Sequence, residues 1–259
     1  MKLLDDLEKR IRPFAVQYVL RYIIAFQIVI FILAIIRPPI IDGAALVPSL
    51  VLQGEVWRLV SFMFLPPVAG LESSFSVLWA IIYWQLLWLF GSSLEAQWGA
   101  ARFNLFLLIG YVATVSMAFI GAADAVGMQN QYLYMTTFLA FARLFPNFTL
   151  HLMFILPVKV RWLALFVWIM MALDFLQPSL MTKLSILAAV SNYLLFFGGE
   201  IIAGIKQRKR RAKHVAEAKA VEEMALHTCS VCGASEQTHP TRDFRYDDDG
   251  TCYCEEHLA

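Results

Sequence analysis

Long apolar segments recur along most of the chain, separated by short polar or charged stretches. The hydrocarbon core of a bilayer is about 30 Å thick, and an α-helix crosses it with about 20 mostly apolar residues. The pattern therefore predicts an all-α membrane protein with six transmembrane helices. Their expected ranges are 22–36, which continues an apolar run from about residue 14, then 75–94, 103–120, 131–146, 162–176 and 184–205.

The fourth of these segments is the shortest and the most polar. It reads QYLYMTTFLAFARLFP and carries Thr136, Thr137 and Arg143 among its apolar residues. Such a helix is poorly suited to face lipid, because polar groups are costly in hydrocarbon. We expect it to lie inside the bundle, shielded by the other helices.

The composition agrees with a membrane protein. The chain is 59% hydrophobic and only 16% charged, against about 45–50% and about 25% in soluble globular domains. All four cysteines lie between Cys229 and Cys254, which argues against a disulfide-stapled exported domain. No cleavage-site pattern follows the first apolar segment, so we interpret it as a retained span.

The connection over residues 40–72 is unusually apolar for a loop. Its apolar runs are too short to span a bilayer, and Pro48, Gly54, Pro66 and Pro67 interrupt them. We expect short helical turns in the membrane interface, with Trp57 at headgroup depth.

Basic residues mark every second connection, which predicts that both termini are cytoplasmic. We divide the chain into an amphipathic cytoplasmic N-terminus (1–21), a membrane domain (22–205), a charged helical linker (206–227) and a small module (228–259). The lipid bilayer is the expected partner, and no nucleic acid is expected. The basic residues of these flanks are Lys2, Lys9, Arg10, Arg12, Arg21, Arg102, Arg143, Lys159, Arg161, Lys206, Arg208, Lys209, Arg210, Arg211 and Lys213.

Several short motifs resemble one family. GEVWRLVSFMFLPP (54–67), with Trp57 and Arg58 at its centre, is similar to the first-loop motif of the rhomboid superfamily. LEAQWGAARF (94–103) places Glu95, Gly99 and Arg102 where such proteins keep an acid, a glycine and a base. The fourth segment ends in Leu-Phe-Pro as in many rhomboids, and residues 143–163 are similar to the derlin branch. The resemblance covers about residues 21–205 and implies a six-helix rhomboid-like bundle.

The resemblance also implies a missing active site. An active rhomboid carries G-x-S-G in its fourth helix and a histidine in its sixth, which activates the serine hydroxyl. Here Gln131 falls at the serine position, counted back from Pro146, and Asn192 falls at the histidine position. All five histidines lie in segments expected to be cytoplasmic, so we predict a catalytically inactive homologue. They are His151, His214, His227, His239 and His257.

These polar residues also have purely structural interpretations. Arg58, Glu95 and Arg102 can serve as hydrogen-bonding anchors, since charges within a membrane domain must be paired in any fold. Asn192 can make a polar contact between helices. Thr136 and its neighbour Thr137 can bond to carbonyls of their own helix.

The C-terminal module carries the spacing of a metal site. Cys229-x2-Cys232 followed by glycine has the form of a zinc knuckle, and Cys254-x2-His257 supplies a second pair. About 30 residues have too little core to fold without a staple, and a reducing cytosol favours metal over a disulfide. We predict structural zinc in a zinc-ribbon-like fold. Cys252 could replace Cys254 or remain a free thiol.

The sequence thus predicts a rhomboid-like, derlin-like pseudoprotease with a zinc-binding cytoplasmic tail. By resemblance, it would bind transmembrane clients for membrane-protein quality control or trafficking, and the zinc module would dock a cytosolic partner. One alternative is an intramembrane peptidase with unrecognised catalytic residues. Another is a non-catalytic membrane scaffold.

Overall fold

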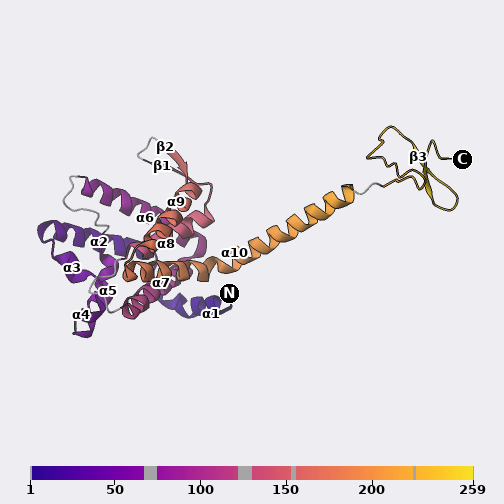
Figure 1. The fold of residues 1–259 in the computed structure, drawn as a ribbon. Coiled ribbons are helices and arrows are strands. Elements are labelled where there is room, and N and C mark those ends of the chain that lie inside the picture. The colour runs from indigo at the N-terminus through magenta and orange to yellow at the C-terminus, as the bar shows by residue number, and fades with distance from the viewer. Residues whose placement is uncertain (1, 67–74, 122–129, 153–155, 224–225, 259) are drawn as a thin grey trace. The chain divides into compact units, whose positions relative to one another are not determined.

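The structure is a computed structural model that describes all residues except 1, 67–74, 122–129, 153–155, 224–225 and 259 (Figure 1). The chain forms two compact units, Met1–Gly199 and Glu200–Ala259. The first is helical apart from one small hairpin, and the second contains the end of a long helix and a small β-hairpin module.

Four helices in the described part of the chain are long and apolar enough to cross a membrane. They are α2 (Val19–Ile36), α6 (Ser76–Trp98), α7 (Ala100–Ile120) and the segment Leu180–Ala216 of α10 (Leu180–Glu223). Large apolar side chains on α2, including Phe26 and Ile32, are more than half exposed. An outward apolar surface of this kind is expected of helices that face lipid.

The other two predicted spans are shorter helices. α8 (Gln131–Leu144) has 14 residues and α9 (Val160–Leu176) has 17. α8 packs against α6, α7 and α9, and most of its side chains are buried. The expectation that this polar segment lies inside the bundle is therefore met. Aromatic contacts hold it there: the ring of Phe90 in α6 packs against those of Phe138 and Phe141 in α8, with centroid distances of 5.1 and 4.9 Å respectively.

The apolar connection after α2 folds into short helices: α3 (Ile40–Ala44), α4 (Pro48–Leu52), α5 (Arg58–Ser61) and the 3-10 turn η2 (Phe62–Phe64). This agrees with the short helical turns predicted there. Asn130 is buried before α8 and donates its amide protons to the carbonyls of Phe62 and Leu65, both at 2.9 Å. Tyr134 donates to the Met63 carbonyl at 2.6 Å, so the connection is tied to the central helix.

The N-terminal segment docks on the turn between α6 and α7. α1 (Lys2–Ile11) and the 3-10 turn η1 (Arg12–Phe14) precede a short connection that ends in a turn at Tyr18, whose φ is 54°. The Arg21 guanidinium lies 4.4 Å from the centre of the Tyr18 ring and 4.5 Å from that of Trp88. These cation–π contacts hold the start of α2 against α6.

Two antiparallel hairpins complete the fold. β1 (Thr149–Leu152) pairs with β2 (Leu156–Lys159) between α8 and α9. This hairpin departs from the all-helical prediction for the first unit, because its strands are only four residues long and lack a clear alternating pattern. In the second unit, β3 (Phe244–Tyr246) pairs with β4 (Cys252–Cys254).

Candidate metal centre

The first ligand pair stands on a tight turn. The Cys229 amide donates to the Ala234 carbonyl at 2.8 Å, and the Gly233 amide donates to the Cys229 carbonyl at 2.9 Å. Gly233 has φ +69°, a left-handed conformation that a residue with a side chain rarely adopts. The turn therefore explains why glycine follows Cys232 directly.

The second ligand pair follows from the hairpin. β4 delivers Cys254, and the chain then turns so that the His257 amide donates to the Cys254 carbonyl at 2.9 Å. A further bond, from the Ser230 amide to the Cys252 carbonyl at 2.9 Å, ties the knuckle to β4. Strand pairing and this bond together bring the two halves of the site face to face.

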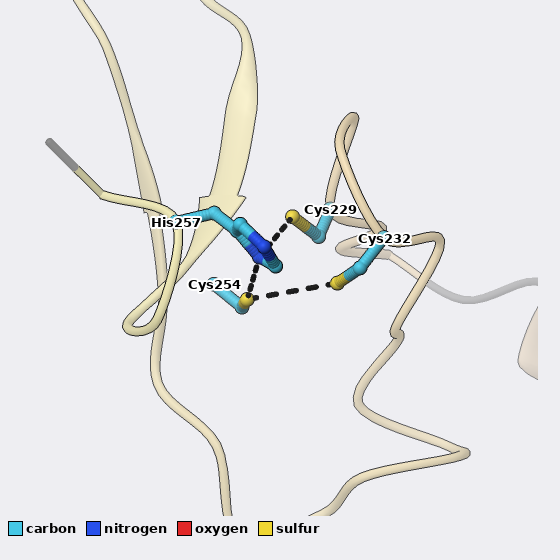
Figure 2. A group of neighbouring side chains, drawn as sticks. All are labelled: Cys229, Cys232, Cys254 and His257. Atoms are coloured by element: carbon cyan, nitrogen blue, oxygen red, sulfur yellow. Dashed lines mark hydrogen bonds between the residues drawn. The ribbon is translucent and has the colours of Figure 1, made fainter.

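The four side chains converge on one point, as Figure 2 shows. The ligand atoms of Cys229, Cys232, Cys254 and His257 all lie within 4.8 Å of one another. The sulfur atoms of Cys232 and Cys254 are 3.8 Å apart, and His257 Nδ1 is 3.2 Å from Cys254 Sγ and 3.9 Å from Cys229 Sγ. These four residues could bind a metal ion.

The spacing fits a tetrahedral ion. With metal–sulfur bonds of about 2.3 Å, two thiolates on a tetrahedron lie about 3.8 Å apart. The separation of Cys232 and Cys254 matches that value. Three sulfur donors and one imidazole form a soft, closed set, the type that structural zinc sites use.

Backbone amides prepare one thiolate. Hydrogen bonds from the amides of Cys232, Cys254 and Val231 favour the charged form of Cys229 and, with the Cys232 side chain, lower the pKa of Cys229 to about 6, although desolvation acts in the opposite direction. Cys229 is nevertheless almost wholly inaccessible to solvent. A thiol that ionises near neutral pH is ready to bind a metal without first losing a tightly held proton.

Cys252 does not belong to this cluster. It pairs across the hairpin with Tyr246, and the pKa of Tyr246 is raised by burial first and then by the neighbouring Cys252 thiol. The Tyr246 hydroxyl also lies 2.9 Å from Nδ1 of His227. Of the two cysteines that the sequence left open, the geometry selects Cys254.

In the helical unit, Trp57 and Arg58 bind the end of α3. Arg58 is buried and forms an ion pair with Glu55 at 2.6 Å. Its Nη1 also donates to the carbonyls of Asp42 and Ala45, at 2.6 and 2.8 Å. Ser61 and Trp57 donate to the two carbonyls between these, Ala44 at 2.9 Å and Gly43 at 3.4 Å. The motif thus caps carbonyls that the end of a short helix leaves without partners.

The second motif receives the N-terminal segment. Glu95 accepts a hydrogen bond of 2.7 Å from the Tyr18 amide, and Arg102 lies 3.9 Å from the Glu8 carboxylate. Gly99 joins α6 to α7 with φ +81° and ψ 159°, which a side chain would disfavour. These three residues act here as anchors of the fold.

The two positions that the sequence resemblance predicted to be degenerate catalytic positions differ in environment. Gln131 is the first residue of α8 and is exposed, whereas Asn192 of α10 is 1% exposed. Among the residues that the structure describes, neither amide atom of Asn192 has a hydrogen-bond partner, and a Cβ on Gly110 of α7 would lie 2.8 Å from its Nδ2. Sequence analysis did not identify Gly110, whose only local signal is a glycine in the middle of an apolar helix.

The two threonines of α8 are both buried but differ in hydrogen bonding. Thr136 donates to the Leu133 carbonyl of its own helix at 2.6 Å, as one interpretation of the sequence expected. Thr137 is fully buried, and its hydroxyl has no hydrogen-bond partner in the described part of the chain. The interior of the unit therefore contains polar groups with unused hydrogen-bonding capacity.

Comparisons of the chain with protein-family models, with curated proteins and with solved structures gave no match.

Proposed function

We propose that this chain is a rhomboid-like membrane protein without protease activity, which holds transmembrane segments of client proteins and carries a zinc-stabilised module that docks a cytosolic partner. The clients would be substrates of membrane-protein quality control or trafficking. The observation that carries the proposal is the buried amide of Asn192, at the place where the resemblance puts a catalytic base.

An amide cannot accept the proton of a serine hydroxyl at neutral pH, so Asn192 cannot act as a general base. In the sequence of the first unit the only histidine is His151, which lies in β1 of the hairpin between α8 and α9. These positions support binding in place of cleavage.

Six crossings are part of the proposal. α8 is about 21 Å long at 1.5 Å per residue, shorter than a bilayer core of about 30 Å. Its neighbours α6, α7 and α9 shield it, which supports a short span inside the bundle. A bilayer that thins around such helices would lower the cost of admitting or extracting a client helix.

Zinc is the proposed metal, since the donor set is closed and leaves no open position for a substrate. The proposed role is structural, with the surface of the folded module as the docking site. The basic flanks support an orientation with both termini in the cytoplasm.

A reconstitution experiment tests the binding function. The purified chain is placed in liposomes with a single-span reporter that carries a photo-crosslinker in its transmembrane helix. We expect a crosslinked adduct of full-length reporter and no cleavage products. Cleavage that is abolished by Ser191→Ala or Thr137→Val would instead establish a peptidase. No adduct and no cleavage would favour a scaffold.

A topology experiment tests the six crossings separately. Reporter fusions after Ala123 and Gln177 should lie outside the cytoplasm, and a fusion after Met224 should lie inside. With only the four longer helices crossing, these three fusions would give the same result, so a fourth fusion, after Asn147 between α8 and α9, separates the two arrangements. It should be cytoplasmic if six helices cross, and a position outside the cytoplasm would overturn the six-span arrangement.

A further inference from the structure

A hollow of about 600 Å³ opens at the end of α2. Its walls come from Arg37, from α3 with the preceding proline, and from both ends of α5. The residues that line it are Arg37, Pro39, Ile40, Gly43, Ala44, Trp57 and Ser61. Sites for small ligands commonly have volumes of about 300–1,000 Å³ and mostly apolar walls with a few polar groups. This hollow has both properties.

The hollow is built by the same contacts that fold the connection. Arg58 and Ser61 donate hydrogen bonds to carbonyls at the end of α3, and Trp57 donates its indole proton to the Gly43 carbonyl at 3.4 Å. The Trp57 ring is nevertheless 56% exposed, so an aromatic surface remains available at the rim. Tryptophan with this exposure favours the headgroup region of a bilayer.

Arg37 supplies the charge. It follows the last residue of α2, its side chain is exposed, and within the described part of the chain it has no hydrogen bond or ion pair from its guanidinium. Because α2 is a candidate span, Arg37 stands at the edge of the hydrocarbon core on either orientation of the helix. A guanidinium there is suited to a phosphate, which it can bind through two parallel hydrogen bonds.

An apolar path leads from Arg37 along α2. Leu33 and Val29 are four residues apart within α2, which places them on one face of the helix, and both are exposed. A ligand with a phosphate at Arg37 could therefore lay a long apolar chain along this face. Free phosphate would pair with the Arg37 guanidinium but would make no contact with the apolar walls.

We propose that this hollow binds one membrane glycerophospholipid per chain. Its phosphate pairs with Arg37, its glycerol and upper acyl chain lie against Trp57 and Ile40, and the rest of the acyl chain follows α2. The site is separate from the metal centre and from the proposed client-binding function, and it requires only that α2 lies in a membrane.

Two variants probe the site from different directions. Arg37→Gln removes the charge from an exposed side chain and should not affect folding. Gly43→Leu adds a large side chain at a residue that lines the hollow, where a Cβ would meet no atom within 4 Å. Arg161→Gln is the matched control, since Arg161 is also an exposed arginine next to a tryptophan, Trp162, and does not line the hollow.

The measurement is native mass spectrometry of delipidated full-length protein titrated with palmitoyl-oleoyl phosphatidylglycerol. We expect one lipid bound to the wild type and to Arg161→Gln. We expect about tenfold weaker binding to Arg37→Gln, equivalent to about 1.4 kcal/mol, and loss of the adduct with Gly43→Leu. Palmitoyl-oleoyl glycerol, which lacks the phosphate, and inorganic phosphate, which lacks the chains, should each bind at least tenfold more weakly.

Three results would overturn the proposal. They are unchanged phosphatidylglycerol binding in both Arg37→Gln and Gly43→Leu, equal binding of the phosphate-free glyceride, and a protein dimer that Gly43→Leu abolishes. The last would assign the hollow to a second copy of the chain. Thermal unfolding of each variant must match the wild type, and a Gly43→Leu protein that unfolds early leaves Arg37→Gln as the deciding variant.

Discussion

Replacement of Cys254 by serine, compared with the same change at Cys252, tests the metal centre at its least predictable position. Cys254 is fully buried and lies next to two of the other three ligands, Cys232 and His257. Cys252 is only two residues away but lies beside Tyr246, outside the cluster. The two variants therefore have the same chemistry and nearly the same sequence position, and differ only in geometry.

The expected loss follows from the binding energy of the whole site. Structural zinc contributes about 10–16 kcal/mol in small modules, or about 2.5–4 kcal/mol for each of four ligands. Since 1.4 kcal/mol is a factor of ten, Cys254→Ser should weaken zinc binding by about 10²- to 10³-fold. Cys252→Ser should change the affinity by less than about threefold, because Cys252 lies outside the cluster of candidate ligands.

The assay is zinc content of the purified full-length variants by elemental analysis, followed by competition with a colorimetric chelator. We expect one zinc per chain in the wild type and in Cys252→Ser, and rapid transfer to the chelator from Cys254→Ser. If Cys252→Ser loses the metal and Cys254→Ser keeps it, the ligand assignment is wrong. A wild type without any metal would refute the centre itself.

Three further predictions concern pH and the helical unit. Folding lowers the pKa of the Cys229 thiol from 9.0 to about 6 in the metal-free module, so stabilisation by this thiolate is complete above the unfolded-state value and is lost as pH falls through about 6. The affinity for zinc should therefore fall as pH is lowered below about 6, because protons then compete with the metal, and an affinity at pH 5 equal to that at pH 7.5 would contradict this. Arg58→Gln should lower the free energy of unfolding of the helical unit by about 3 kcal/mol. This is the lower end of the range for a broken buried ion pair, because Glu55 is partly exposed. Thermal unfolding in detergent should show a larger decrease in melting temperature for Arg58→Gln than for Trp57→Ala. Gly110→Ala should destabilise the helical unit by about 1–3 kcal/mol, because the added Cβ would press on the buried Leu133 and Asn192. The control Gly198→Ala, at a position with open space, should destabilise it by less than about 1 kcal/mol. Equal melting temperatures of the two variants would refute the close approach at Gly110.

The local sequence was enough to predict the long apolar helices and the two candidate ligand pairs. Apolar length is a property of each segment, so α2, α6, α7 and α10 could be expected before any packing was known. The pair Cys229 and Cys232 depends on a turn of five residues, and the glycine that the turn needs follows directly. Both features are decided within a few residues of chain.

Tertiary structure decided what depends on partners distant in sequence. Cys254 and Cys252 share one strand, and only its pairing with β3 and its bond to the knuckle select Cys254. Arg58 is an anchor because α3, which lies 14 residues or more before it in the chain, ends beside its guanidinium. Asn192 has no hydrogen-bond partner among the described residues and lies beside Gly110 of α7, which also approaches Leu133 of α8, and no short sequence window contains all three. Burial and hydrogen-bond satisfaction are sums over neighbours in space, which a one-dimensional pattern of apolar and polar residues does not contain.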